Sequence, residues 1–96
     1  MFEKQIEAGI AKLDSYFGRD NWLPKINLDN LRMQCIGDCI VGQIEKGYGK
    51  NLPENWSGLP RWYPKALGFS LGHANSDDPR YQTLTEEWKS AISKLN

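Results

Sequence analysis

The chain has 96 residues, the size of one domain, and its 40% hydrophobic and 25% charged residues are typical of a folded protein rather than a disordered one. Its formal net charge of zero provides no overall basic field, so we expect no binding to double-stranded DNA. No apolar run approaches the roughly 20 residues of a membrane span, and the N-terminus lacks a signal-peptide pattern. We therefore expect a single domain over residues 1–96 that stays in the cytoplasm and contacts no membrane.

Residues 2–17 have the pattern of an amphipathic helix. Apolar side chains recur at helical spacing and so share one face, namely Phe2, Ile6, Ile10, Leu13 and Phe17. Gly18 follows, where a C-terminal cap in the left-handed region is expected. This pattern predicts a long helix whose apolar face packs on the rest of the domain.

Residues 19–34 predict a connection that carries apolar anchors. Pro24 disfavours helical geometry at the residue before it, which points to a break in the chain there. Ile26 and Leu28 alternate with polar neighbours, which permits a short strand near 25–28. Asp29 could equally cap a short turn of helix, so both alternatives stay open.

A shorter helix is predicted near residues 36–47, with Asp38 as the expected N-cap. Its apolar face is expected to include Cys39, Ile40 and Ile44, and glycines end it. Cys35 and Cys39 are the two cysteines of the chain. A secreted domain of this size usually has more of them, so we expect two reduced, buried thiols.

Residues 48–66 predict an ordered, aromatic-rich loop. Three prolines and two glycines exclude a long helix there. The segment also holds four aromatic side chains, which are more than a solvated linker needs, namely Tyr48, Trp56, Trp62 and Tyr63. Leu67, Phe69 and Leu71 then alternate with small residues, which permits a short strand.

The last segment predicts a second long helix. Its apolar stripe has helical spacing and consists of Tyr81, Leu84, Trp88, Ile92 and Leu95. The helix begins near residue 79 if Asp78 caps it, or near 84 if Thr83 and Glu86 form a capping box. We therefore predict a mainly α fold, with two long amphipathic helices packed on a short central helix and an aromatic-rich loop. The alternative is a small α+β fold with a minor strand pair near 25–34 and 67–71.

This layout resembles a family of small uncharacterised proteins of actinobacterial phages and prophages. The resemblance rests on a Cys–Ile–x–Gly–Gln stretch at residues 39–43, a Leu–Thr–x–x–Trp ending at residues 84–88, and scattered matches elsewhere. Those matches are Ile6, Glu7, Ala8, Gly9, Trp22, Ile26, Leu31, Met33, Asp38, Gly68, Phe69 and Tyr81. Residues 50–65 depart from the family, in which the region is shorter and more acidic. The resemblance implies a phage or prophage accessory gene and identifies no catalytic residue.

No residue pattern indicates an enzyme or a resident cofactor. Structural zinc normally takes four Cys or His ligands, and the chain offers Cys35, Cys39 and His73. Cys39 near a helix N-terminus could act as a nucleophile with His73 as its base, but no further signature surrounds either residue. We therefore expect a non-enzymatic protein without metal or cofactor.

The positive charge of the chain is concentrated in residues 46–66. Four lysine and arginine residues against one glutamate give this segment a balance of +3, while the remainder of the chain sums to −3. Bases stack on aromatic rings and cations neutralise phosphate, so the segment suits a nucleotide or a short single strand. The predicted ligand-binding residues are Lys50, Trp56, Arg61, Trp62, Tyr63 and Lys65. The alternative is that these rings only pack the loop onto the helices.

Two functions follow from these patterns. The first is sequestration of a small anionic, nucleotide-like ligand, such as a signal used in antiphage defence. The second is a protein–protein inhibitor or adaptor that docks on a host enzyme, because Trp, Tyr and Arg are also typical interface anchors. A small core and zero net charge further predict association into a homo-oligomer.

Overall fold

A computed structural model describes residues 1–35, 37–53, 56, 65–71, 75 and 77–95 of the chain. Its longer helices are α1 (Glu3–Phe17), α3 (Ile40–Tyr48) and α5 (Arg80–Leu95). The short α2 (Arg19–Trp22) and three 3-10 turns, at Leu23–Lys25, Leu28–Asn30 and Gly49–Asn51, connect them. Over the described residues the fold is mainly α, as the sequence predicts.

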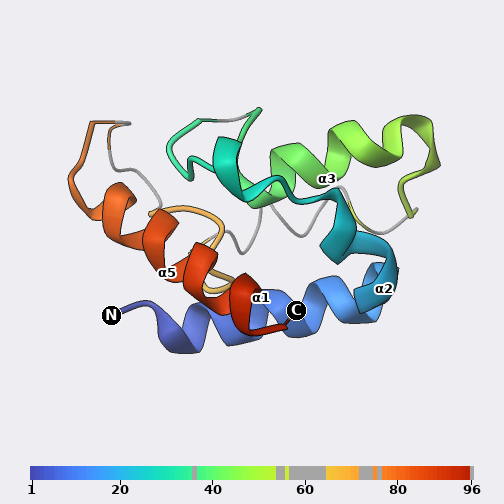
Figure 1. The fold of residues 1–96 in the computed structure, drawn as a ribbon, viewed down its shortest axis with the longest axis horizontal. Coiled ribbons are helices and arrows are strands. Elements are labelled where there is room, and N and C mark those ends of the chain that lie inside the picture. The colour runs from blue at the N-terminus through green and yellow to red at the C-terminus, as the bar shows by residue number, and fades with distance from the viewer. Residues whose placement is uncertain (36, 54–55, 57–64, 72–74, 76, 96) are drawn as a thin grey trace.

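The helices surround a shared interior. In Figure 1, α1 runs along the bottom and α3 along the top, and α5 slants down so that its C-terminal end meets α1. α2 turns the chain upward at the end of α1. The two predicted long helices therefore lie against each other, while α3 closes the opposite side.

The predicted apolar stripe of α1 faces this interior, with one addition. Ile6, Leu13 and Phe17 are buried, and so is Gly9, which the stripe did not include. A Cβ atom built on Gly9 would lie only 2.2 Å from the backbone oxygen of Leu67. Glycine therefore allows a neighbouring stretch of backbone to lie directly on α1.

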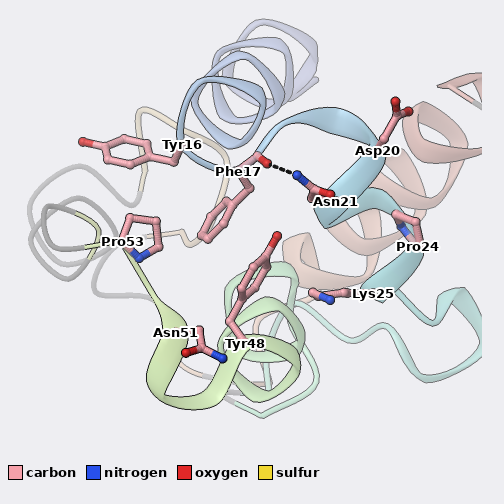
Figure 2. Close-up of a pocket in the computed structure, with 9 residues that line it drawn as sticks. All are labelled: Tyr16, Phe17, Asp20, Asn21, Pro24, Lys25, Tyr48, Asn51 and Pro53. Carbon is pink, nitrogen blue, oxygen red and sulfur yellow. Dashed lines mark hydrogen bonds between the residues drawn. The ribbon is translucent and has the colours of Figure 1, made fainter.

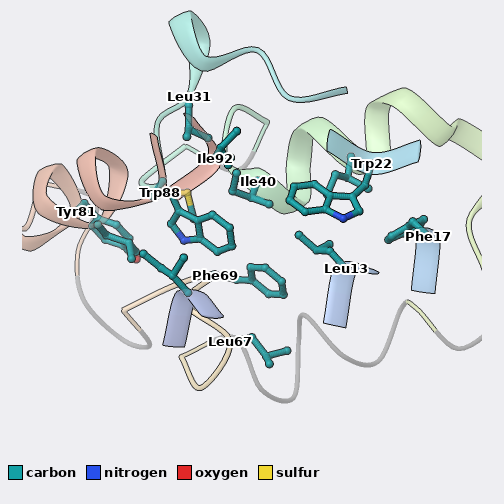
Figure 3. Close-up of a cluster of buried hydrophobic side chains, with 14 of the residues drawn as sticks. Leu13, Phe17, Trp22, Leu31, Ile40, Leu67, Phe69, Tyr81, Trp88 and Ile92 are labelled. Atoms are coloured by element: carbon teal, nitrogen blue, oxygen red, sulfur yellow. The ribbon is translucent and has the colours of Figure 1, made fainter. Parts of the chain in front are cut away.

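Three tryptophans form the centre of the core. Trp22 and Trp88 are fully buried and Trp56 is 1% exposed. Figure 3 shows Trp22 and Trp88 gathered with Leu13, Ile40 and Phe69 in the space between the helices. The Trp88 indole N–H donates to the carbonyl oxygen of Gly68 at 2.6 Å, so its one polar atom is satisfied in the interior.

The corner between α1 and α2 is held by one carboxylate. Gly18 adopts a φ of 84°, in the region that favours glycine, and its N–H donates to the Asp14 carbonyl. The Asp14 carboxylate accepts hydrogen bonds from the Trp22 indole N–H at 2.8 Å and from the Arg19 guanidinium at 2.8 Å. Partial burial opposes ionisation of Asp14, but these two hydrogen bonds outweigh it and lower its pKa.

The strand pair of the α+β alternative is absent from the described residues. The expected strand near 25–28 is replaced by two 3-10 turns, the second capped by the Asn27 side chain, which accepts from the Asp29 N–H at 3.0 Å. Asp29 is therefore not the cap. The expected strand at 67–71 is also wrong for the described residues, because Gly68 turns the backbone with a φ of 71°.

Helix α3 begins later than the sequence predicted. Its N-cap is Cys39 rather than Asp38, and the Cys39 sulfur accepts from the Gly42 N–H at 3.3 Å. Gln43 on this helix then contacts the backbone of Asn27 in both directions, accepting from its N–H at 2.6 Å and donating to its carbonyl at 3.2 Å. A glutamine that the sequence analysis left without a role thus fixes the connection to α3.

Helix α5 begins at Arg80, so the first of the two predicted starts is confirmed. The Asp78 carboxylate accepts from the Arg80 backbone N–H at 2.9 Å and from its guanidinium at 2.7 Å. These hydrogen bonds lower the pKa of Asp78 to about 2. Further along the helix, the Thr85 hydroxyl accepts from the Met33 N–H at 2.9 Å and so connects α5 to the segment before α3.

Candidate functional site

Three of the six predicted ligand-binding residues lie in the described part of the chain. Lys50 is exposed in the 3-10 turn that follows α3, and Lys65 is exposed as well. The predictions for Arg61, Trp62 and Tyr63 lie outside the described residues.

Trp56 belongs to the core rather than to an open binding surface. Its ring meets the rings of Phe17 at 4.9 Å, Tyr16 at 5.7 Å and Phe69 at 6.5 Å between centroids, each edge to face. With 1% of its surface exposed, the indole has no free face on which a base could stack. For this residue the structure corrects the predicted stacking role, and the packing alternative describes it.

An open pocket of about 400 Å³ lies beside this aromatic cluster, between the end of α1 and the end of α3. Its lining comes from four successive parts of the chain: Tyr16 and Phe17; Asp20 and Asn21; Pro24 and Lys25; and Tyr48, Asn51 and Pro53. Figure 2 shows the rings of Phe17 and Tyr48 next to each other at the middle of this lining, with the Tyr16 hydroxyl and the Asp20 carboxylate pointing away from them. None of the three described residues of the predicted site lines this pocket, although Tyr48 and Asn51 flank Lys50 in the sequence.

Lys25 and Tyr48 form the most distinctive contact of the pocket. The Lys25 ammonium nitrogen lies 4.6 Å from the centre of the Tyr48 ring, within the range of a cation–π interaction. The Phe17 ring also packs against the Tyr48 ring, and the two ring centroids lie 4.7 Å apart. Asn21 donates from its side-chain amide to the Phe17 carbonyl at 2.8 Å and so fixes the end of α1 beside them.

The path of Lys25 depends on a glycine of α3. A Cβ atom on Gly47 would lie 2.7 Å from Cδ of Lys25 and 3.3 Å from its Cγ. The aliphatic stem of the lysine therefore lies directly on the helix backbone, which delivers its charged end to the Tyr48 ring. Pro24, at the start of the 3-10 turn that carries Lys25, fixes the approach of this segment.

The charges of the lining are one cation and one anion, Lys25 and Asp20. Lys50 is exposed and precedes Asn51 of the lining in the sequence. It belongs to the segment of residues 46–66, which carries the net positive charge. An ammonium group recognises phosphate, while a carboxylate accepts hydrogen bonds from hydroxyl groups such as those of a ribose. The pocket thus combines aromatic side chains, one ammonium group and one carboxylate.

The sequence analysis missed Lys25 and Asp20 because they lie in the connection after α1, more than twenty positions from Tyr48. No local pattern joins a lysine in one segment to a tyrosine in another. Tyr48 itself had a signal, since it is one of the four aromatics of the basic segment.

The environment of Cys39 does not activate it as a nucleophile. Cys35 and Cys39 form no disulfide, and each is partly buried. Burial raises the pKa of Cys39, and this outweighs the hydrogen bonds from the first turn of α3 that act in the other direction. In the described part of the chain no three acidic, cysteine or histidine side chains come together as a metal site requires; His73 lies outside it.

No protein-family model, curated protein or solved structure matches this chain. Among the described helices, none has the length and apolar character needed to cross a membrane.

Proposed function

We propose that this protein binds a small anionic molecule that contains a ring, such as a nucleotide, in the pocket of Lys25 and Tyr48. The observation that carries the proposal is the position of the Lys25 ammonium over the Tyr48 ring at the edge of an open pocket. A ring of the ligand would stack on an aromatic side chain of the lining, and its phosphate would replace water around Lys25.

The neighbouring groups support the same chemistry. Asp20 can accept a hydrogen bond from a sugar hydroxyl, and the Asn51 amide can both donate and accept. Lys50 adds a second cation near the opening. Arg61, Trp62, Tyr63 and Lys65 stay predicted contributors from the adjoining basic segment.

We propose binding rather than catalysis because the described lining supplies one cation, a carboxylate, amides and tyrosines but no nucleophile paired with a base. Together with the resemblance to phage and prophage proteins, this suggests an accessory protein that sequesters a nucleotide signal of antiphage defence. Such a protein needs affinity and abundance, and it needs no chemical step.

Calorimetric titration with nucleoside monophosphates and diphosphates, free nucleosides and inorganic phosphate tests the proposal. We expect nucleotides to bind more tightly than free nucleosides or inorganic phosphate. The affinity for nucleotides should fall as the salt concentration rises, because exposed charges are screened. Lys25→Gln should weaken nucleotide binding by about tenfold or more, as expected for loss of a charged hydrogen bond. Lys12→Gln removes an exposed lysine of α1 outside the lining and serves as the matched control.

Substitutions at Tyr48 test whether its ring positions Lys25 for the ligand. Tyr48→Phe keeps the ring and should retain most of the affinity, whereas Tyr48→Leu removes the cation–π contact of Lys25 and should weaken nucleotide binding. Equal binding by the Lys25→Gln and Lys12→Gln variants would refute the assignment of the pocket.

The protein-adaptor function is the alternative, because the exposed part of the basic segment could also anchor a partner protein. The burial of Trp56 removes one of the four aromatics from both functions alike. If no nucleotide binds and one host protein co-purifies with the chain instead, the adaptor becomes the better description.

A further inference from the structure

A groove of about 570 Å³ runs between α1 and α5, away from the pocket of Lys25 and Tyr48. Its walls are Met1, Glu3, Ile6, Glu7 and Ile10 on one side and Glu87, Ser90, Ala91, Lys94 and Leu95 on the other. A second hollow of about 280 Å³ continues it past Ala11 to Asp14 and Arg19, and the two hollows share Glu7, Ile10 and Leu95. We call this combined surface the α1–α5 groove.

The floor of the α1–α5 groove is apolar and partly open. Met1 is 78% exposed and is the one large hydrophobic side chain of the described residues that is classed as exposed. Ile10, Ala91 and Leu95 are half-buried around it, and only Ile6 is fully buried. A hydrophobic strip that is left uncovered in this way gains stability when a second surface covers it.

The two helices run in the same direction along the groove. Glu87 of α5 accepts hydrogen bonds from the backbone nitrogens of Met1 and Phe2 at 3.1 and 2.8 Å, so these positions lie side by side. Leu95, eight residues later, lines the hollow with Ile10. Glu3 to Ile10 and Glu87 to Lys94 each span seven residues, or about 10 Å of helix.

The charges of the groove differ between its two ends. Glu3 and Glu87 lie at the start, where the N-terminal ammonium pairs with Glu87 at 3.1 Å, and Glu7 lies further along, where it lines both hollows. Lys94 lies at the other end, beyond which Arg19 is paired with Asp14 at 2.8 Å, so that pair adds no net charge. The carboxylates of the groove therefore lie at its start and middle, and Lys94 supplies a positive charge at its far end.

We propose that the α1–α5 groove is the contact face of a homodimer in which two copies pair in opposite directions. A two-fold axis across the middle of the groove brings the acidic end of each copy to the basic end of its partner, because a symmetric interface uses the same patch twice. Lys94 of each copy then lies at the end of the groove where its partner has Glu87 and Glu3, and the apolar strips cover each other. The open strip is short, so the dimer is in concentration-dependent equilibrium with the monomer.

This inference does not rest on the proposed function. The ligand pocket begins at Tyr16, at the far end of α1, and shares no lining residue with the groove or its continuation. Either proposal can therefore fail without the other.

Sedimentation velocity of the untagged protein over a concentration series tests the dimer, with an expected limit of twice the 11.0 kDa monomer mass. Glu3→Lys and Lys94→Glu each bring like charges together at both symmetric ends of the groove and should each weaken the dimer by about tenfold. The double variant exchanges the two charges and should recover the affinity of the parent. Lys12→Glu changes an exposed lysine of α1 outside the groove by the same charge and should leave the equilibrium unchanged.

Circular dichroism of each variant confirms that it is folded, which these exposed positions allow. A monomer at all concentrations would overturn the proposal. So would a dimer that responds to Lys12→Glu as strongly as to Lys94→Glu, because net charge and not the groove would then control it. Failure of the double variant to recover would rule out the antiparallel pairing.

Discussion

Gly9 allows a direct test of how α1 packs, because helix propensity and packing predict opposite effects of a Gly9→Ala substitution. In an exposed helix interior, alanine is more stable than glycine by about 1 kcal/mol. At Gly9, however, the new methyl group would lie 2.2 Å from the backbone oxygen of Leu67 and 3.2 Å from the ring of Trp88. An ordinary carbon–oxygen contact is roughly 3.3 Å or longer, so the two backbones must separate by about 1 Å.

That movement disturbs several buried contacts at once. Leu67 is 6% exposed and Phe69 is 5% exposed, and the carbonyl of Gly68 between them accepts the 2.6 Å hydrogen bond from Trp88. Overpacking of this kind destabilises a protein by about 1–3 kcal/mol, and weakening a buried hydrogen bond adds to that. After the propensity gain is subtracted, we expect Gly9→Ala to lower the free energy of unfolding by about 2 kcal/mol.

Urea unfolding followed by circular dichroism measures this difference, which corresponds to a fall in Tm of roughly 10 °C for a domain of this size. Lys12 is exposed on the same helix, so comparing Lys12→Ala with Lys12→Gly gives the propensity difference without the clash. If Gly9→Ala stabilises the protein by the same amount as that pair indicates, the close approach of the Leu67 backbone to α1 is refuted.

Three further substitutions test other contacts by the same unfolding measurement. Asp14→Ala leaves the buried indole N–H of Trp22 without its acceptor and should cost about 1–3 kcal/mol. Because the pKa of Asp14 is lowered on folding, its contribution to the free energy of unfolding is complete above its ordinary pKa of 3.8 and is lost as the pH falls through the folded value. In Asp14→Asn the free energy of unfolding should therefore fall less steeply at acid pH. Cys39→Ala should cost about 0.5–1 kcal/mol through loss of the α3 cap, whereas Cys39→Ser should not; equal losses would contradict the capping role. Trp56→Phe should cost less than Trp88→Phe, because the Trp56 indole N–H has no hydrogen-bond partner in the described structure, whereas that of Trp88 has one; the reverse order would contradict this.

The sequence predicts the long helices well because their apolar stripes persist over four turns. α1 and α5 each begin within one residue of an expected start, since one buried face dominates the choice of structure there. α3 is shorter, and two residues compete for its cap. Asp38 is the stronger capping type, yet its carbonyl accepts the side-chain amide of Gln43 while Cys39 caps the helix.

The expected strand at 67–71 shows a different limit of sequence patterns. Alternation of Leu67 and Phe69 with glycine and serine predicts one buried face of a strand, and both apolar side chains are indeed buried. A turn with glycine at a φ of 71° buries them equally well. Alternation therefore identified the buried residues, but it could not distinguish an extended segment from a turn.

The candidate site could be predicted only where its signal was local. The density of aromatic residues marked Tyr48, and charge marked Lys50, because both lie within one segment. The contact of Lys25 with Tyr48 depends on the turn at Pro24 and on the bare backbone of Gly47. Neither residue indicates a ligand site in the sequence, because the contact forms only when the fold brings the two segments together.

The two proposed surfaces both use α1 but share no lining residue, and this predicts how binding and association are related. The groove follows α1 to Asp14 and continues to Arg19, whereas the pocket begins at Tyr16 and includes Tyr48 of α3. Pairing through the groove therefore uses no residue of the pocket lining. We expect one nucleotide per chain, with the same Kd above and below the monomer–dimer transition. Calorimetric titration of the parent protein and of Lys94→Glu at matched concentrations measures this. A Kd that changes with dimerisation would require a coupling free energy between the surfaces, because linkage is reciprocal. That result would contradict the independence of the two surfaces.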